Sequence, residues 1–390
     1  MRAEIRQCFT GKDYSGWCNL IQTLLKHLID RYGRDEATSW PVEVWNEPNL
    51  EGFWKNADME EYFKLFRETF LAVKEVDEKF RVGGPAVCGG TDEIWIRKFL
   101  DYCSSNDIDL DFVTRHHYTC DISERIGHYA YPAPDDPQWG RDNLKTTRDI
   151  TDSFERFCGR EIHITEFNTS WYPRTVIHDT NFNAAYIAHQ LSWLGDLNES
   201  YSYWTFGDVF EETGVPFSMF HGGFGLVANG CVPKPTFWTF KFYKNLKERG
   251  TECAYRSENT VIMRKSDGGF CGTAWNFSTE GTAEELMLDI AIETEDGEFA
   301  LVMYIVDPVT CDPLKVWHDI GEPKTPTEMQ LDIIKSAAQP FTKTERLRAS
   351  GGKLEKKIPI RDCGVVYFEL TPSELISDRG YDYSRVIEIR

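Results

Sequence analysis

The 390-residue sequence lacks several features that would assign it to a common class of proteins. It contains no run of about 18 apolar residues, so we predict no membrane span. Residues 1–7 contain no apolar core of a signal peptide, and we therefore expect a cytoplasmic protein. No Gly-x-Gly-x-x-Gly motif opens a predicted helix, which argues against a dinucleotide-binding fold.

Basic residues are too few for a protein that binds nucleic acid. The sequence has 43 Lys and Arg residues against 63 Asp and Glu residues, which gives a formal net charge of -20. Nucleic acids and anionic membrane surfaces are also negative, so we expect neither as a partner. A neutral substrate would be indifferent to this charge.

Cysteine is present without any pattern of pairing. None of the 11 cysteines belongs to a Cys-x-x-Cys pair, and their number is odd. We interpret most of them as small buried apolar residues in a reducing compartment. The His and Asp residues show no spacing typical of metal ligands, so we predict no metal site.

What the sequence does contain, up to about residue 248, is an alternation of predicted strands and helices. The strand candidates are residues 42–45, 81–87, 110–118, 161–166 and 201–206. The predicted helices cover residues 17–32, 58–73, 94–104, 153–158 and 180–194. In the second of them Phe63, Phe66, Phe70 and Val73 form the predicted buried stripe. Such alternation is typical of an α/β protein with a parallel sheet, either a barrel or an open doubly wound sheet.

The pattern changes after this point to short β-rich segments. The candidates are residues 260–264, 270–276, 286–292, 300–306 and 364–370, with one predicted helix near 327–338. This pattern is typical of a β-sandwich. We therefore predict a catalytic domain over residues 1–248 and a β-sandwich accessory domain over residues 249–390.

Two short carboxylate motifs stand where predicted strands end. Asn46 and Glu47 follow the strand 42–45, and Glu166 closes the strand 161–166. A retaining glycosidase needs one ionised carboxylate as nucleophile and a second carboxyl group as general acid and base. In a (β/α) barrel the carboxyl ends of the strands converge on one site, so Glu166 and Glu47 suit these two roles. Each motif alone has an ordinary alternative, because strand-end Glu residues pair with Arg and Asn-Glu-Pro occurs in turns.

Further polar and aromatic residues stand near predicted strand ends. His116 and Tyr118 alternate on one strand and share a face, whereas Trp204 closes the last strand of the first part. Glu211 and Glu212 follow in a loop and could bind sugar hydroxyls. Core packing, or a solvated acidic pair in the case of the two glutamates, is the alternative for each.

Five segments of the sequence resemble glycoside hydrolase family 39, and specifically its bacterial β-xylosidases. They are residues 43–50, 82–86, 163–169, 202–206 and 220–226. The resemblance implies a TIM-barrel type (β/α)8 fold, with Glu47 as acid and base on strand 4 and Glu166 as nucleophile on strand 7. The residues that it implies around the sugar are Asn46, His116, Tyr118, Trp204, Glu211 and Glu212. It implies no cofactor, a xylo-oligosaccharide or aryl xyloside as substrate, and a homo-oligomer.

The sequence departs from this family pattern in two places. Trp171 stands where the xylosidases usually have Tyr, which affects one contact with a sugar hydroxyl. If Glu47 ends strand 4, only strands 4–8 have counterparts here, and five strands do not close an eight-stranded barrel. We therefore expect an incomplete, N-terminally truncated barrel whose open edges favour self-association.

The main hypothesis is a retaining, exo-acting glycosidase that removes xylose from β-xylosides. One alternative is an α-L-iduronidase or arabinosidase of the same family, for which Arg115 is the candidate partner of a substrate carboxylate. The other is an inactive, truncated barrel that binds carbohydrate or self-associates.

Overall fold

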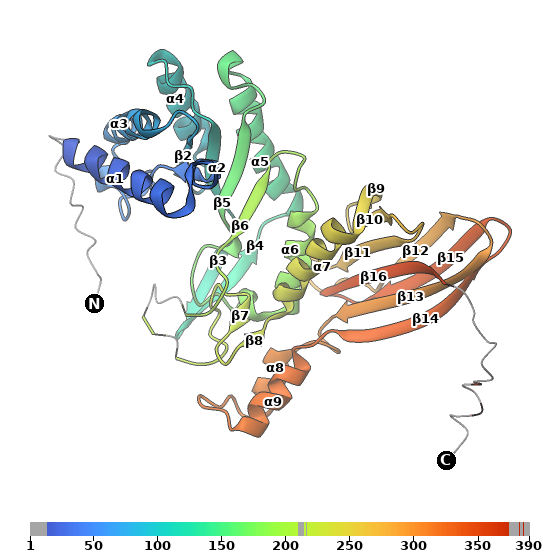
Figure 1. Ribbon diagram of the computed structural model, residues 1–390. Coiled ribbons are helices and arrows are strands. Elements are labelled where there is room, and N and C mark those ends of the chain that lie inside the picture. The colour runs from blue at the N-terminus through green and yellow to red at the C-terminus, as the bar shows by residue number, and fades with distance from the viewer. Residues whose placement is uncertain (1–13, 210–213, 216, 374–381, 383–384, 386–390) are drawn as a thin grey trace. The chain divides into compact units, whose positions relative to one another are not determined.

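The computed structural model describes residues 14–209, 214–215, 217–373, 382 and 385 (Figure 1). Its contacts define two compact units that alternate along the chain. The first unit is Met1–Asp121, Pro134–Trp171 and Trp193–Trp204, and the second is Ile122–Ala133, Tyr172–Ser192 and Thr205–Arg390. The division into domains at residue 248 stays a prediction. Among the described residues, every helix is too short or too polar to cross a membrane.

A curled parallel sheet lies at the centre of the first unit (Figure 1). Its strands are β1 (Pro41–Glu43), β2 (Arg81–Val87), β3 (Phe112–Ile126), β5 (Glu161–Ser170) and β6 (Ser200–Tyr203), paired in that order. All four pairings are parallel. The strand β4 (Tyr129–Pro134) also pairs with β3. The mixed α/β fold with a parallel sheet, which the alternation predicts, is therefore confirmed.

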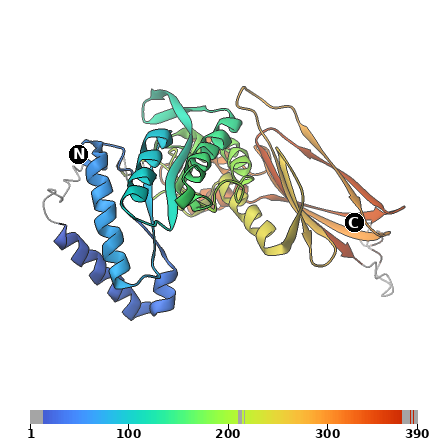
Figure 2. The same ribbon diagram turned by 90° about the horizontal axis from the view of Figure 1, so that it is seen from above.

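Helices accompany this sheet in the intervals between its strands. They are α1 (Ser15–Tyr32), α2 (Arg34–Ser39), η1 (Lys55–Ala57), α3 (Met59–Val76), α4 (Asp92–Ser105), α5 (Pro137–Asp152) and η2 (Glu155–Phe157). Along α3 the predicted apolar stripe of Phe63, Phe66, Phe70 and Val73 is buried. The helices α1 and α3 pack together (Figure 2). Between them the Trp17 indole donates to the Thr69 hydroxyl at 2.7 Å.

The helix predicted over residues 153–158 is wrong. The long helix α5 ends just before this segment, which instead contains the single turn η2. Apolar periodicity misses α5 because two residues of its buried face, Thr147 and Thr151, are polar. Its start is set by Asp136, whose carboxylate accepts from the backbone of Gln138 at 2.7 Å.

Close approach of two strands explains the glycines that follow Val82. A Cβ atom on Gly83 would lie 2.3 Å from both the ring and the carbonyl oxygen of Phe112 on β3. Only glycine therefore allows β2 and β3 to pair at this point. Behind the sheet, the buried Tyr62 hydroxyl donates to the carbonyl of Val44 at 3.0 Å, which ties α3 to the segment that follows β1.

The second unit contains an antiparallel six-stranded sheet and a separate two-stranded sheet (Figure 2). The larger sheet has the order β14-β13-β16-β11-β10-β9, and β12 pairs with β15. The bounds are Gly250–Ser257 (β9), Thr260–Lys265 (β10), Phe270–Asn276 (β11), Leu286–Glu293 (β12), Gly297–Val306 (β13), Phe341–Ala349 (β14), Lys353–Ile360 (β15) and Gly364–Ser373 (β16). Both sheets contribute to one apolar core, with Leu301 and Phe368 from the larger and Ile290 and Ile358 from the smaller.

Helices and a short hairpin complete the second unit. They are η3 (Val176–Asp179), α6 (Asn181–Leu191), β7 (Val227–Ala228), β8 (Val232–Pro233), α7 (Pro235–Arg249), α8 (Pro313–Asp319) and α9 (Glu328–Ala337). The predicted helix near 327–338 is confirmed as α9, but α8 is a second helix that the sequence analysis missed. Its seven residues are too few to show a helical period.

One buried cation organises the Gly-rich segment of the second unit. The Lys234 ammonium group is fully buried, 2.6 Å from Asp179 and 2.7 Å from Asp208, and it donates to the carbonyl of Gly223 at 2.8 Å. Burial by itself lowers the pKa of Lys234, but the two carboxylates raise that pKa above its usual value, so the lysine stays charged.

The same two carboxylates hold the backbone of residues 220–226. The amide of Gly222 donates to Asp179, and that of Gly225 donates to Asp208, each at 2.7 Å. A Cβ atom on Gly225 would lie 2.5 Å from the backbone of Asp208. The glycines here allow close packing around buried carboxylates.

Removing the Lys234 charge should destabilise the protein strongly. Breaking a buried ion pair costs about 3–5 kcal/mol because the remaining charge is uncompensated, and we expect Lys234→Met to lower the free energy of unfolding by about that amount. Denaturant unfolding followed by circular dichroism measures this change. Lys244→Met on α7 is the matched control, because its side chain is 60% exposed and should matter by less than about 1 kcal/mol. Equal losses in both variants would contradict the role of Lys234.

Candidate active site

Glu47 lies just after β1 and is held by the end of β2. Its backbone amide donates to the carbonyl of Ala86 at 3.0 Å, and Trp45 and Glu47 have φ values of 72° and 46°. This left-handed backbone is costly for residues other than glycine and is concentrated at functional sites. The predicted strand 42–45 is thus shorter in the structure, and the turn that replaces its end buries Glu47 to 7% exposure.

The strands β3 and β5 bring the other central residues together. In their parallel register His116 lies beside Glu166, and Tyr118 lies beside Asn168. Arg115 pairs with Ile164, so β5 has one extra residue between the two pairs, which is Thr165. This irregularity turns Glu166 to the side of the sheet that His116 occupies.

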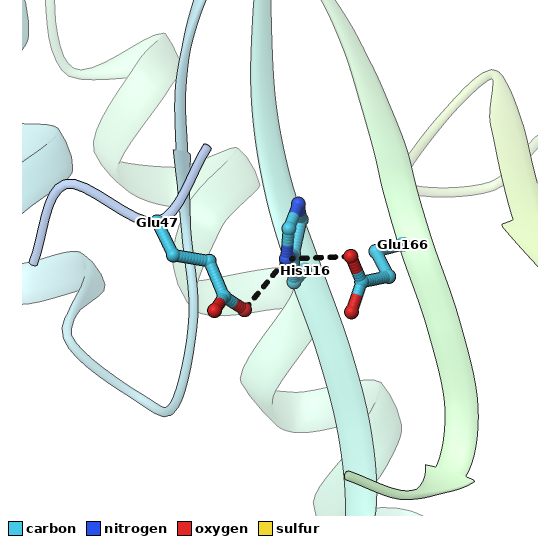
Figure 3. A group of neighbouring side chains, drawn as sticks. All are labelled: Glu47, His116 and Glu166. Carbon is cyan, nitrogen blue, oxygen red and sulfur yellow. Dashed lines mark hydrogen bonds and ion pairs between the residues drawn. The ribbon is translucent and has the colours of Figure 1, made fainter. Parts of the chain in front are cut away.

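His116 lies between the two glutamates, as Figure 3 shows. Its Nδ1 atom is 2.8 Å from Glu47 Oε1 and 3.6 Å from Glu166 Oε2. The other oxygen of Glu166 accepts a hydrogen bond from the Tyr118 hydroxyl. Four residues of the predicted site, including both glutamates, therefore form one cluster within the first unit.

Burial governs the electrostatics of Glu166. It raises the pKa of this carboxyl group, and the neighbouring Glu47 charge raises it further. His116 and the hydrogen bond from Tyr118 act in the opposite direction and lower the pKa. Two specific partners thus offset part of the effect of burial on Glu166, whose pKa stays above its usual value.

Cys88 is a neighbour of the site that the sequence analysis missed. Burial, with Glu47 as the next cause, raises the pKa of its thiol to about 12. Asn49 holds the residue in place by donating to the Cys88 carbonyl at 3.0 Å and accepting from the Cys88 amide at 3.2 Å. The thiol therefore stays protonated beside Glu47. No sequence signal marks Cys88, because the contact depends on how residues 46–49 fold over the end of β2.

Arg115 is occupied away from the central cluster. Its guanidinium group is buried and lies 2.8 Å from Asp92. It also donates to the Thr147 hydroxyl at 2.9 Å and to the Asn143 side chain at 2.7 Å. This residue has the role of a buried structural cation that links β3 to α4 and α5.

The remaining predicted site residues lie at the ends of the same strands. Asn46 is exposed beside Glu47, and Trp171 is 48% exposed after the end of β5. Trp204 is half-buried and donates its backbone amide to Phe167 at 2.9 Å. Glu211 and Glu212 lie outside the described residues. The predicted site residues that the structure describes thus lie at or near strand ends. Side-chain contacts join four of them, which are Glu47, His116, Tyr118 and Glu166.

The comparisons with known proteins agree in pointing to one family. The model of glycosyl hydrolases family 39 matches residues 7–355. A β-xylosidase of Geobacillus stearothermophilus is 41% identical over 365 residues, which cover 92% of this chain and 71% of the relative. A β-xylosidase of Caldicellulosiruptor saccharolyticus is 31% identical over 346 residues, which cover 84% of this chain and 67% of that protein.

Solved structures give the same result. A family 39 enzyme from Xanthomonas axonopodis pv. citri superposes with a TM-score of 0.83 at 28% identity, over 93% of this chain and 74% of the other. A monomeric β-xylosidase from Caulobacter crescentus CB15 has a TM-score of 0.82 at 30% identity, over 92% and 75%. The extent of these matches shows that the chain belongs to glycosyl hydrolase family 39 and is an enzyme of the glycosidase type.

Proposed function

We propose that this chain is a retaining glycosidase that removes xylose from β-xylosides, including xylo-oligosaccharides and aryl xylosides. The observation that carries the proposal is the close approach of Glu47 and Glu166. One carboxylate oxygen of Glu47 lies within 4.8 Å of one carboxylate oxygen of Glu166. Retaining enzymes place their carboxyl groups about 5–5.5 Å apart, whereas inverting enzymes need about 6.5–9.5 Å to admit a water. The names of the two β-xylosidase relatives support xylose as the sugar.

In the first step Glu166 acts as the nucleophile. Its carboxylate attacks the anomeric carbon and forms an ester, while the bond from that carbon to the glycosidic oxygen breaks. Glu47 gives its proton to the departing oxygen. Tyr118 and His116 support this step because both favour the ionised form of Glu166 against the effect of burial.

In the second step the roles of the two groups change. Glu47, now ionised, takes a proton from a water molecule whose oxygen attacks the anomeric carbon and releases Glu166. We assign contacts with the sugar to Asn46, His116 and Tyr118, and stacking to Trp204 and Trp171. Glu211 and Glu212 keep their predicted role as partners of sugar hydroxyls.

The position of Arg115 favours a neutral sugar over an iduronide. A substrate carboxylate requires a facing cation, and Arg115 is the candidate that the sequence offers. Its guanidinium group is buried and engaged by Asp92 at 2.8 Å. Moving it to a substrate would leave the buried Asp92 charge uncompensated.

We also propose the finer architecture that accompanies this function. The five parallel strands correspond to strands 4–8 of a (β/α)8 barrel, and the two antiparallel sheets, which share one core, form a β-sandwich. Self-association through the open sheet edges stays a prediction. The similar β-xylosidase from Caulobacter crescentus CB15 is monomeric. Sedimentation of the purified chain measures it.

Replacing the two glutamates should separate their roles. Glu166→Gln should abolish hydrolysis, whereas Glu47→Ala should lower kcat/KM for xylobiose by about 10²–10⁴-fold. The loss in Glu47→Ala should be smaller for an aryl xyloside whose leaving group needs no proton. A 2-deoxy-2-fluoro-xyloside should add one covalent adduct to the parent chain and none to Glu166→Gln, as measured by intact mass.

Glu161→Gln is the matched control for these variants, because Glu161 lies on the same strand but pairs with Arg81. It should hydrolyse xylosides and accept the adduct like the parent chain. A folded parent chain with neither turnover nor adduct would favour the inactive alternative.

The hydrogen bond from Tyr118 should set the acid limb of the pH profile. It lowers the pKa of Glu166, so Tyr118→Phe raises this pKa and leaves the nucleophile protonated up to a higher pH. We expect the acid limb of kcat/KM to move to higher pH in Tyr118→Phe, with activity partly restored as the pH rises. Tyr102→Phe on α4 removes a hydroxyl outside the cluster and should leave the limb in place. An unchanged limb in Tyr118→Phe would exclude the proposed role of the hydroxyl.

The buried charge of Glu166 should reduce stability. Consider a carboxyl group whose pKa is higher in the folded than in the unfolded chain. It destabilises the fold at pH values above both of these pKa values, and the effect disappears at pH values below both of them. We therefore expect Glu166→Gln to be more stable by about 1 kcal/mol near pH 7. The gain should shrink as the pH falls through the raised pKa of Glu166, and it should be absent below about 4, where the group is protonated in both states. Denaturant midpoints across this range measure the difference.

Glu161→Gln again serves as the control, because the pKa of Glu161 is shifted in the opposite direction to that of Glu166. Burial raises the pKa of Glu161, but Arg81 and His163 lower it below its usual value. Glu161→Gln should therefore bring no gain in stability at neutral pH. A gain of equal size in both variants would show that the charge of Glu166 is not the cause.

A further inference from the structure

The central cluster of the site is also a set of metal ligands. Glu47, His116 and Glu166 each offer one ligand atom, and these atoms lie within 4.8 Å of one another. His116 is 2% exposed and Glu47 is 7% exposed, whereas the Glu166 side chain keeps 17% exposure. The cluster is thus shielded from bulk water without being sealed from it. The sequence predicts these three residues in one site but no metal there, because ligands from three distant segments show no characteristic spacing.

The spacing of the two carboxylate oxygens from His116 is near that of a zinc site. Tetrahedral Zn²⁺ has ligand bonds of about 2.0–2.1 Å, which separates neighbouring ligand atoms by roughly 3.3 Å. The distances from His116 Nδ1 to Glu47 Oε1 and to Glu166 Oε2 are 2.8 and 3.6 Å (Figure 3). These two values lie on either side of the zinc spacing, and the two carboxylate oxygens lie within 4.8 Å of each other. Binding of the ion therefore requires the two carboxylates to approach each other. Because Tyr118 engages the other oxygen of Glu166, the oxygen that faces His116 is oriented for a ligand.

We propose that the site binds one divalent ion of the zinc class through His116 Nδ1 and one oxygen each of Glu47 and Glu166. The ion takes the place of the proton between His116 and its carboxylate partner, and its two charges balance the two carboxylates. Zn²⁺ and Co²⁺ accept mixed imidazole and carboxylate ligands. Mg²⁺ and Ca²⁺ prefer six or more oxygen ligands, which this set does not offer.

The bound ion is an inhibitor of hydrolysis, a consequence that rests on the proposed function. It occupies the nucleophile and the acid and base together, so that neither step of the reaction can proceed. Because a xyloside and the ion need the same carboxylates, their binding is mutually exclusive. The inhibition is therefore competitive with the substrate and is reversed by a chelator.

Binding is measured apart from turnover, on the full chain. Calorimetric titration with Zn²⁺ and the absorption of Co²⁺ both report the ion directly. We expect one ion per chain at this site and no competition by Mg²⁺. His116→Asn and Glu166→Gln should each weaken binding at least about 100-fold, since even the loss of an outer-shell partner typically costs 10–100-fold. Far-ultraviolet circular dichroism checks that both variants are folded.

Cys88→Ser provides the decisive control, because the chain has 11 cysteines and thiolates also bind zinc. Cys88 adjoins Glu47 but lies outside the proposed ligand set. Binding that survives in Cys88→Ser and is lost in His116→Asn supports the proposal. Binding that is absent, or lost in Cys88→Ser and kept in His116→Asn, overturns it. The expected binding in a metal-free chain that fails to hydrolyse xylosides would support the ion site while rejecting the proposed function.

Discussion

The register between β3 and β5 is the constraint on which the central cluster depends. His116 lies beside Glu166 only because β5 has one extra residue, Thr165, after the pair of Arg115 with Ile164. Successive side chains of a strand point to opposite faces, so a strand without this irregularity would turn Glu166 away from His116. Irregularities of this kind often redirect a side chain next to an active site. The site is therefore a product of strand pairing, and the glutamate alone would not create it.

The buried charges of the chain fall into two groups with different consequences. Arg115 with Asp92, and Lys234 with two carboxylates, are pairs in which each charge is met by an opposite one at 2.6–2.8 Å. Such pairs hold elements in place and are costly to break. Glu166 differs because its partners are a hydroxyl and an imidazole, which compensate its charge only in part, as its raised pKa shows. Incomplete compensation leaves a carboxylate able to react.

Sequence patterns predicted the parts of the structure that depend on local order. The stripe of Phe63, Phe66 and Phe70 follows from helical periodicity, and the convergence of Glu47 and Glu166 follows from the rule that parallel strands end at one edge. The extra residue in β5 and the neighbour Cys88 could not be predicted, because both depend on pairing between distant segments. The role of Lys234 could not be predicted either, since nothing local indicates that its partners are buried carboxylates.

The position of His116 bears on how two carboxylates can exchange roles without a large movement. In the proposed mechanism both glutamates compete for one imidazole nitrogen, at 2.8 Å from Glu47 and 3.6 Å from Glu166. Formation of the ester removes the negative charge of Glu166, so this charge no longer opposes a negative charge on Glu47. His116 is then left with Glu47 as its only carboxylate partner of the pair, at 2.8 Å. The change of role follows from electrostatics in a fixed frame.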